Sequence, residues 1–186
     1  MDIEKLPKSA KDVLEFWYHA DNQTYWFVKS ADFDNKIRDK FADLVERVAA
    51  GETSAWRANI LGRLAEIIVL DQFTRNIYRG TPKAFAYDGV ALVLSQEAVA
   101  SMDFTKIDTT YQKFIAMPYM HSESKLIHEQ AVQIFTAIGD VNTLDFELKH
   151  KAIIDRFGRY PHRNAILGRV SDEEELAFLQ LPNSGF

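Results

Sequence analysis

The sequence predicts an all-α fold, a compact array of about eight or nine antiparallel helices. Apolar residues recur at three- and four-residue intervals along nearly the whole chain, which is the spacing of one helix face. No segment alternates apolar and polar residues as a half-buried strand does. Glycines and capping residues divide the periodic segments into helix-sized lengths, and the short connections between them favour antiparallel neighbours.

The N-terminal half contains three expected helices. Residues 33–48 carry the first clear apolar stripe. A longer pattern runs over residues 56–79 and is closed by Gly80, the residue that most easily ends a helix. The Thr-Pro pair at 81–82 then provides an N-cap and a first-turn proline for a helix to about Met102.

The C-terminal half is divided into shorter segments. Pro118 is expected to end a helix over residues 108–118, because proline lacks the N–H that a helix interior needs. Ser122 is the expected N-cap of the next helix, which ends before Gly139. The remaining helices are expected over residues 146–157 and 161–167, and from a capping box at Ser171–Glu174 to about Leu181.

The composition limits the possible classes of protein. With 186 residues, 47% of them hydrophobic, the chain is expected to form a single helical domain over residues 1–186, with a tail at 182–186. A formal net charge of −5 disfavours nucleic-acid binding. The absence of cysteine excludes disulfides, thiolate zinc sites and cysteine nucleophiles. No apolar run has the length of a signal peptide or membrane span, so we expect a cytoplasmic protein that does not bind membranes.

Two segments end a helix with the same Asp-x-Phe-x-Arg pattern, EIIVLDQFTRN at 66–76 and KAIIDRFGR at 151–159. Stacked helix pairs would produce such an echo, although two copies are also compatible with chance. Arginines cluster at both places: Arg75 and Arg79 at the first, and Arg156, Arg159, Arg163 and Arg169 at the second.

The second arginine cluster requires a negative partner. His162 and Arg163 lie in the first turn of an expected helix, where a cation opposes the helix dipole by roughly 0.3–1 kcal/mol. Guanidinium groups match the geometry of both carboxylate and phosphate. The partner is therefore either a bound anion or a carboxylate of the protein, for which the candidates are Asp71, Asp155, Glu66 and Glu123.

A third polar patch is PYMHSES at 118–124. Glu123 and Gln130 lie seven residues apart beside an apolar stripe, so both are expected to point toward the rim of the core and to pair with arginines. His150 lies within the stripe of 146–157 and is expected to be a hydrogen-bonded core residue. No metal site is expected, because the single Glu147-x-x-His150 motif lacks the second copy that a di-iron bundle needs.

The segments LDQFTRNIYRGTPKAFAYD (70–88), PYMHSE (118–123) and RFGRYPHRNAILGR (156–169) resemble the bacterial family called domain of unknown function 924, over roughly residues 12–180. The resemblance implies a tetratricopeptide-repeat-like helical fold and no established activity. Thr74 departs from the family, which commonly has proline there, so the helix geometry before Arg75 is uncertain. The positions that match the signature are Asp71, Gln72, Arg75, Asn76, Arg79, His121, Ser122, Glu123, Arg156, Arg159, His162, Arg163 and Asn164.

The leading functional hypothesis is a polar pocket that binds a small anionic ligand bearing phosphate or carboxylate. The expected ligand-binding residues are Arg75, Asn76, Arg79, Ser122, Glu123, Arg156, Arg159, Arg163 and Asn164, supported by Asp71, Gln72, Gln130 and His150. His121 and His162 are the candidate acid–base groups, because histidine titrates near neutral pH, and whether the protein is an enzyme stays open.

The alternative hypothesis is a helical scaffold that binds a protein or an acidic peptide, with a purely structural network of Arg, Asp and His. No cofactor, nucleic-acid or membrane partner is expected, and the sequence does not indicate an oligomeric state.

Overall fold

The computed structural model describes residues 3–182, 184 and 185, and within them it contains helices and no strand. The all-α prediction is confirmed. The α-helices are α1 (Lys8–Trp17), α2 (Ala20–Gln23), α3 (Ala31–Ala49), α4 (Ile60–Ile67), α5 (Thr74–Ile77), α6 (Asp88–Val99), α7 (Thr109–Met120), α8 (Lys125–Ile138), α9 (Val141–Phe157) and α10 (Glu173–Leu179). None of the helices in this part of the chain is both long and apolar enough to span a membrane.

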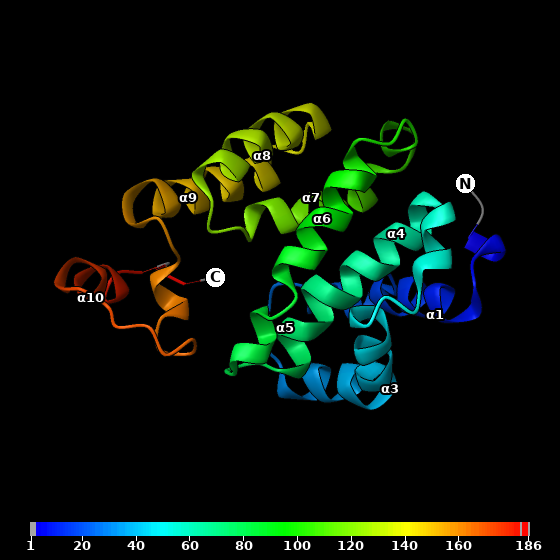
Figure 1. Ribbon diagram of the computed structural model, residues 1–186, viewed down its shortest axis with the longest axis horizontal. Helices are drawn as coiled ribbons and strands as arrows, with labels where there is room; N and C mark the ends of the chain where they lie inside the picture. Colours follow the sequence, from blue (N-terminus) through cyan, green and yellow to red (C-terminus); the bar gives the residue numbers. More distant parts are fainter. Residues whose placement is uncertain (1–2, 183, 186) are drawn as a thin grey trace.

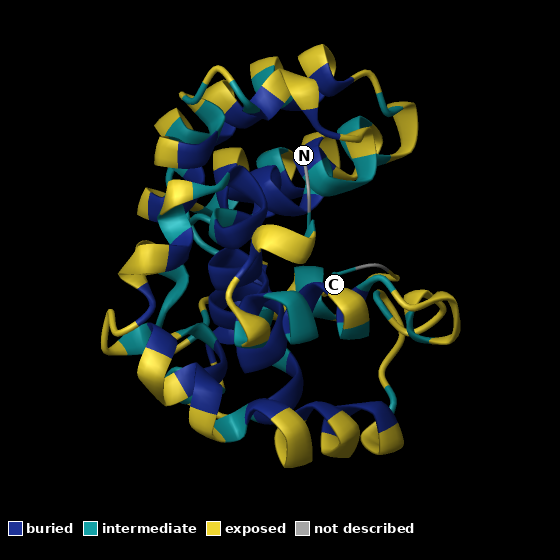
Figure 2. Ribbon diagram, turned by 90° about the vertical axis from the view of Figure 1, so that its right-hand side faces the viewer, coloured by how far each residue is buried: buried dark blue, intermediate teal, exposed yellow. Residues whose placement is uncertain are grey.

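The centre of the molecule is one buried helical rod made of α4, a π-helical segment η3 (Ile68–Phe73) and α5. It packs against α1, α3, α6 and α7, so nearly all of its residues are buried, polar ones included, and only Arg63 and Arg75 are partly exposed. Figure 2 shows this rod as the continuous buried region in the middle of the fold. When the rod is counted as one helix, the described residues contain nine α-helices, in agreement with the number predicted.

The predicted helix over 56–79 differs from the structure at its start and in its middle. Residues Ser54–Ala58 form a separate 3-10 segment, and the rod itself begins at Ile60, where the Asn59 side chain accepts a hydrogen bond from the Leu61 amide. The rod contains no proline in its interior and continues through Thr74, whose hydroxyl donates to the Leu70 carbonyl. The widened π turn was not predicted, because a helix buried on all sides leaves no polar face from which the period can be measured.

Two helix boundaries near prolines were wrongly predicted. The segment after Pro82 is a short 3-10 turn (η4, Pro82–Phe85), and α6 begins only at Asp88. Helix α7 continues past Pro118 to Met120. The proline removes only one hydrogen bond, near the end of a helix whose last seven residues are all buried, so packing outweighs the loss.

The predicted start of α8 was also wrong. Ser124, not Ser122, is its N-cap, and its left-handed C-cap Gly139 leads directly into α9 at Val141. Helix α9 begins five residues earlier than predicted. Its buried side holds Glu147 and His150, and Phe146 is exposed. Consecutive helices α7, α8 and α9 pack side by side (Figure 1).

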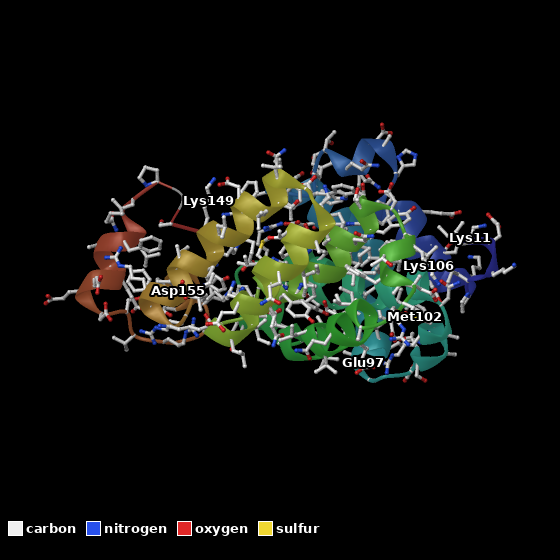
Figure 3. All side chains as sticks on the ribbon, turned by 90° about the horizontal axis from the view of Figure 1, so that it is seen from above. Lys11, Glu97, Met102, Lys106, Lys149 and Asp155 are labelled. Carbon is white, nitrogen blue, oxygen red and sulfur yellow. The ribbon has the colours of Figure 1, made fainter. Side chains whose placement is uncertain are left out.

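The chain after α9 forms one end of the molecule. Figure 3 places Lys149 and Asp155 of α9 toward that end and Lys11 of α1 at the other. The predicted helix over 161–167 is only a 3-10 turn, η6 (Pro161–Arg163). Helix α10 has the predicted capping box one position later, between Asp172 and Glu175. The predicted tail at 182–186 includes residues 183 and 186, which lie outside the described residues.

Candidate functional site

A pocket of about 300 Å³ opens where η4, the start of α6, the end of α7 and the segment after α9 meet. Its polar lining residues are Asp88, His121, Ser122, Glu123 and Arg163. Its apolar wall includes Phe85, Leu92, Pro118 and Leu167. The site therefore combines a small number of polar groups with an apolar surface, as ligand pockets commonly do.

Asp71 lies directly behind the pocket, on the π-helical segment of the rod, and is fully buried. It accepts hydrogen bonds from Gln72 Nε2 (2.6 Å to Oδ2), and Arg75 Nη1 lies 3.1 Å from Oδ1. Burial alone would raise the pKa of this carboxyl group, but the charge of Arg75 and the contact with His121 hold it below its usual value. Asp71 is therefore a buried carboxylate that stays ionised.

His121 is held by this carboxylate. Its Nδ1 lies 2.7 Å from Asp71 Oδ1, and its side chain is 16% exposed in the pocket wall. Burial lowers the pKa of His121, which leaves the imidazole neutral at pH 7. An ionised Asp71 can only accept, so Nδ1 carries the proton and Nε2 is an unprotonated acceptor. Among the described residues no group hydrogen-bonds to Nε2.

Arg163 is a second charged residue of the pocket wall and is held next to His121. Its guanidinium carbon lies 4.7 Å from the ring centre of Phe85 and 4.5 Å from that of Tyr160, so the group is stacked between two aromatic faces. Nη2 donates to the His121 carbonyl (3.0 Å), whereas Nη1 is 3.3 Å from Asp88 Oδ2. Burial, followed by repulsion from Arg75, lowers the pKa of Arg163.

Asp88 is shared between two arginines. Arg75 Nη2 donates to its Oδ2 at 2.9 Å, closer than Arg163 does. Buried Asp88 Oδ1 and Arg163 Nε have no partner in the described part of the chain. The contact between Arg163 and Asp88 is thus long and shared with Arg75, and two polar atoms beside the pocket have unused hydrogen-bonding capacity.

A second buried network supports the turn that carries His121 and Ser122. Tyr160 donates its hydroxyl to the Met120 carbonyl (2.6 Å), and His128 Nε2 lies 2.8 Å from the Ser122 carbonyl. Nδ1 of the same imidazole is 2.7 Å from Glu147 Oε1, and burial raises the pKa of Glu147. Because the Ser122 carbonyl can only accept, Nε2 carries a proton, and one further proton is held between Nδ1 and Glu147. These hydrogen bonds fix the backbone on both sides of His121.

Several residues proposed for the anion site lie elsewhere. Arg79 forms a two-point ion pair with Asp34 of α3 (2.6 and 2.8 Å), and Asn76 donates to a backbone carbonyl beside it. Arg156 pairs with exposed Glu174 at 2.6 Å. Arg159 forms a two-point pair with Glu175 (2.6 and 2.7 Å), and Asn164 donates to the same carboxylate. The structure therefore does not bring these five residues to the pocket.

The supporting residues are also divided. Glu123 lines the pocket but is bound by both Nη atoms of Arg169 (2.6 and 2.9 Å) and by the Tyr160 amide. The prediction that Gln130 points inward was wrong, because this side chain is exposed on α8. His150 is buried, as predicted, and its Nδ1 lies 2.7 Å from the Phe146 carbonyl.

His162, the other candidate acid–base group, lies outside the pocket lining. Its ring packs at 5.5 Å from that of Tyr160, and Nδ1 is buried without a partner among the described residues. Burial, together with the nearby charge of Arg163, lowers its pKa to about 4. Among residues 3–182, 184 and 185 no carboxylate hydrogen-bonds to this imidazole, whereas His121 is held by Asp71, so His121 is the better placed of the two.

Sequence reasoning missed three residues of the site: Phe85, Asp88 and Tyr160. All three fall within the motif segments 70–88 and 156–169, so the motifs did contain the signal. The two aromatic rings carry no charge that would indicate a site in the sequence, and Asp88 lies at the end of its motif, 75 residues away from the arginine that it contacts.

Comparison with known proteins agrees with this architecture. The sequence profile of a family described as bacterial protein of unknown function (DUF924) matches residues 13–183. The chain is also similar to a solved structure, a protein of unknown function from Agrobacterium tumefaciens, with 33% sequence identity and a TM-score of 0.87. That similarity covers 92% of this chain and 96% of the other. A search among curated proteins gives no match.

Proposed function

The chain belongs to the DUF924 family of bacterial proteins of unknown function, and we propose that its pocket binds a small anionic ligand through Arg163, preferably one with a single carboxylate. The observation that carries this proposal is the state of Arg163. It is a buried, rigidly stacked guanidinium in a pocket wall, with one weak carboxylate contact and an unused N–H.

The charge balance favours a singly charged ligand. Around the pocket, Arg75 and Arg163 are balanced by Asp71 and Asp88, and Arg169 balances Glu123. One additional negative charge can be compensated if His121 takes up a proton, whereas a phosphate dianion would leave one charge uncompensated in a poorly solvated site. We therefore favour a monocarboxylate over a phosphate monoester.

The remainder of the pocket suits a short apolar ligand body. The apolar lining residues include Phe85, Leu92, Pro118 and Leu167. The pocket volume of about 300 Å³ is at the small end of known ligand sites. The proposed ligand class is thus a small monocarboxylic acid with an aliphatic or aromatic body.

Calorimetric titration with acetate, butyrate, benzoate and inorganic phosphate tests this function. The wild-type protein should bind at least one of the carboxylates more tightly than phosphate, and Arg163→Gln should weaken that binding at least tenfold. Arg79→Gln is the matched control, because Arg79 pairs with Asp34 away from the pocket. Equal affinity in Arg163→Gln and wild type, or no binding of any carboxylate, would contradict the proposal.

The alternative scaffold hypothesis has support at particular residues. Arg79, Arg156 and Arg159 each contact a carboxylate of the protein, which is the structural role that this hypothesis assigns to the cluster. Among the expected ligand-binding arginines, Arg163 is the one for which that explanation is incomplete, because its carboxylate contact is long and its Nε has no partner among the described residues.

A further inference from the structure

The pocket contains the parts of a general-base catalyst. Asp71, His121 and the pocket lie in one line of contacts, because the carboxylate accepts from Nδ1 while Nε2 is left without a partner on a partly exposed imidazole. In this arrangement a buried carboxylate fixes the tautomer and stabilises the imidazolium that forms when Nε2 takes a proton. A histidine that only supported the fold would have both nitrogens satisfied, as His128 has.

The same pocket also contains a cationic group, the guanidinium of Arg163. The Arg163 guanidinium donates to the backbone carbonyl of His121, so the cationic group is held next to the residue that carries the imidazole. Nη1 and Nη2 each have one acceptor among the described residues, so each has a second N–H for negative charge that develops on a ligand held beside His121. The stacking on Phe85 and Tyr160 holds the donor in place before any ligand arrives.

The charge balance of the pocket favours a reaction that creates one positive and one negative charge together. A reaction that creates one positive charge near Asp71 and one negative charge near Arg163 leaves the balanced pocket neutral as a whole. General-base attack of water on an ester does so, because it produces an imidazolium and a tetrahedral oxyanion together.

We propose that the pocket hydrolyses esters of small carboxylic acids, with His121 as catalytic base, Asp71 as its positioning residue and Arg163 as oxyanion donor. The proposal rests on the carboxylate-binding function above, since the acid product carries the same single charge in the same position.

The steps balance as follows. Nε2 of His121 accepts a proton from water while the water oxygen bonds to the acyl carbon, and the carbonyl π electrons move to the oxygen facing Arg163. When the tetrahedral intermediate collapses, the bond to the alkoxy oxygen breaks. Nε2 returns its proton to this leaving group, which departs as an alcohol, and the carboxylic acid product loses its own proton to solvent.

The pH dependence follows from the groups that face the imidazole. These groups are Asp71, Arg75, Asp88, Arg163 and the ring of His150 at 6.5 Å. Since burial lowers the pKa of His121 below 6.5, the base form persists at neutral pH, and the rate should fall only under more acidic conditions.

The test measures hydrolysis of p-nitrophenyl acetate and p-nitrophenyl butyrate by the full chain. His121→Gln should lower kcat/KM at least 100-fold, as expected for loss of a general base. His19→Gln is the matched control, because this histidine is exposed on the surface, and it should keep the wild-type rate. Asp71→Asn should lower kcat more than it raises KM, since an amide would hold Nε2 in the protonated form.

Two measurements separate the possible failures. Butyrate, titrated calorimetrically, should bind wild type and inhibit its hydrolysis with an inhibition constant equal to its Kd. If wild type binds butyrate but hydrolyses no faster than His121→Gln, the catalytic proposal fails and carboxylate binding stands. If acetate, butyrate and benzoate neither bind nor inhibit, both proposals fail. Should His121→Gln not fold, the wild-type pH profile decides, because a rate that does not decrease below pH 6.5 excludes His121 as the base.

Discussion

Arg163 serves the fold as well as the proposed ligand site. Its guanidinium stacks between two rings and donates to the carbonyl of His121, so its removal leaves a gap and an unpaired buried acceptor. Asp88, however, keeps its closer partner Arg75 and is not left as an isolated charge.

For this reason we expect Arg163→Gln to lower the free energy of unfolding by about 1–3 kcal/mol, less than the roughly 3–5 kcal/mol for orphaning a buried charge. Urea denaturation of the variant and wild type measures the difference. A loss above that range would mean that Asp88 depends on Arg163 more than the two distances indicate.

At the scale of the helix, Gly62 determines how closely α4 approaches the preceding turn. A Cβ at this position would lie 2.0 Å from the carbonyl oxygen of Trp56 in η2 (Ser54–Ala58). The oxygen belongs to the backbone and cannot move aside as a flexible side chain would. Gly89 near the start of α6 has no atom within 4 Å of the same position.

These surroundings give opposite expectations for the same substitution. Gly62→Ala should lower the free energy of unfolding by about 1–3 kcal/mol through steric strain, although alanine favours a helix. Gly89→Ala should raise it by up to about 1 kcal/mol, because only helix propensity changes. Thermal and urea unfolding of both variants check the pair. A stabilised Gly62→Ala would show that η2 is not held against α4.

The sequence determines the helices more closely than their ends. Amphipathic helices such as α3 are predictable because one face meets water and the period can be counted. The rod has no such face, so its π turn cannot be found in this way. At Pro118, burial of the last turns of α7 outweighs the local rule that proline provides, and at 161–167 the expected helix is only a 3-10 turn.

The candidate site could be predicted in part for a related reason. The unusual local patterns around His121 and Arg163 predicted that both belong to a polar site. The structure brings them together through a hydrogen bond across 42 residues. The partners of the other arginines could not be predicted, because any of several carboxylates would satisfy a guanidinium. Which one does so depends on helix packing: Arg79 contacts Asp34, 45 residues earlier in the chain.

For the molecule as a whole, buried histidines make the free energy of unfolding depend on pH in the mildly acidic range. Burial lowers the pKa of His162 from 6.5 to about 4, and that of His150 to about 3. Above pH 6.5 both are neutral in the folded and the unfolded chain and add no pH dependence. Between pH 6.5 and 4 the unfolded chain binds protons that the folded chain does not, so acidification destabilises the protein.

Each such histidine should contribute a slope of up to about 1.4 kcal/mol per pH unit within that range. Urea unfolding at pH 7.5, 6, 5 and 4.5 measures the total slope of the unfolding free energy with pH. His162→Gln should reduce this slope by the contribution of about one proton. A free energy of unfolding that stays constant from pH 7.5 to 5 would contradict the lowered pKa values.

The segment beyond α9 is attached to the rest of the molecule partly through ion pairs. Its contacts with the α7–α8 turn include the ion pair between Glu123 and Arg169, each about one quarter exposed, and Arg163 also contacts Asp88 at the start of α6. Charges near water are screened over about 8 Å at physiological ionic strength and about 3 Å in 1 M salt. Salt concentration, which scarcely affects the apolar rod, therefore acts first on the segment that completes the pocket.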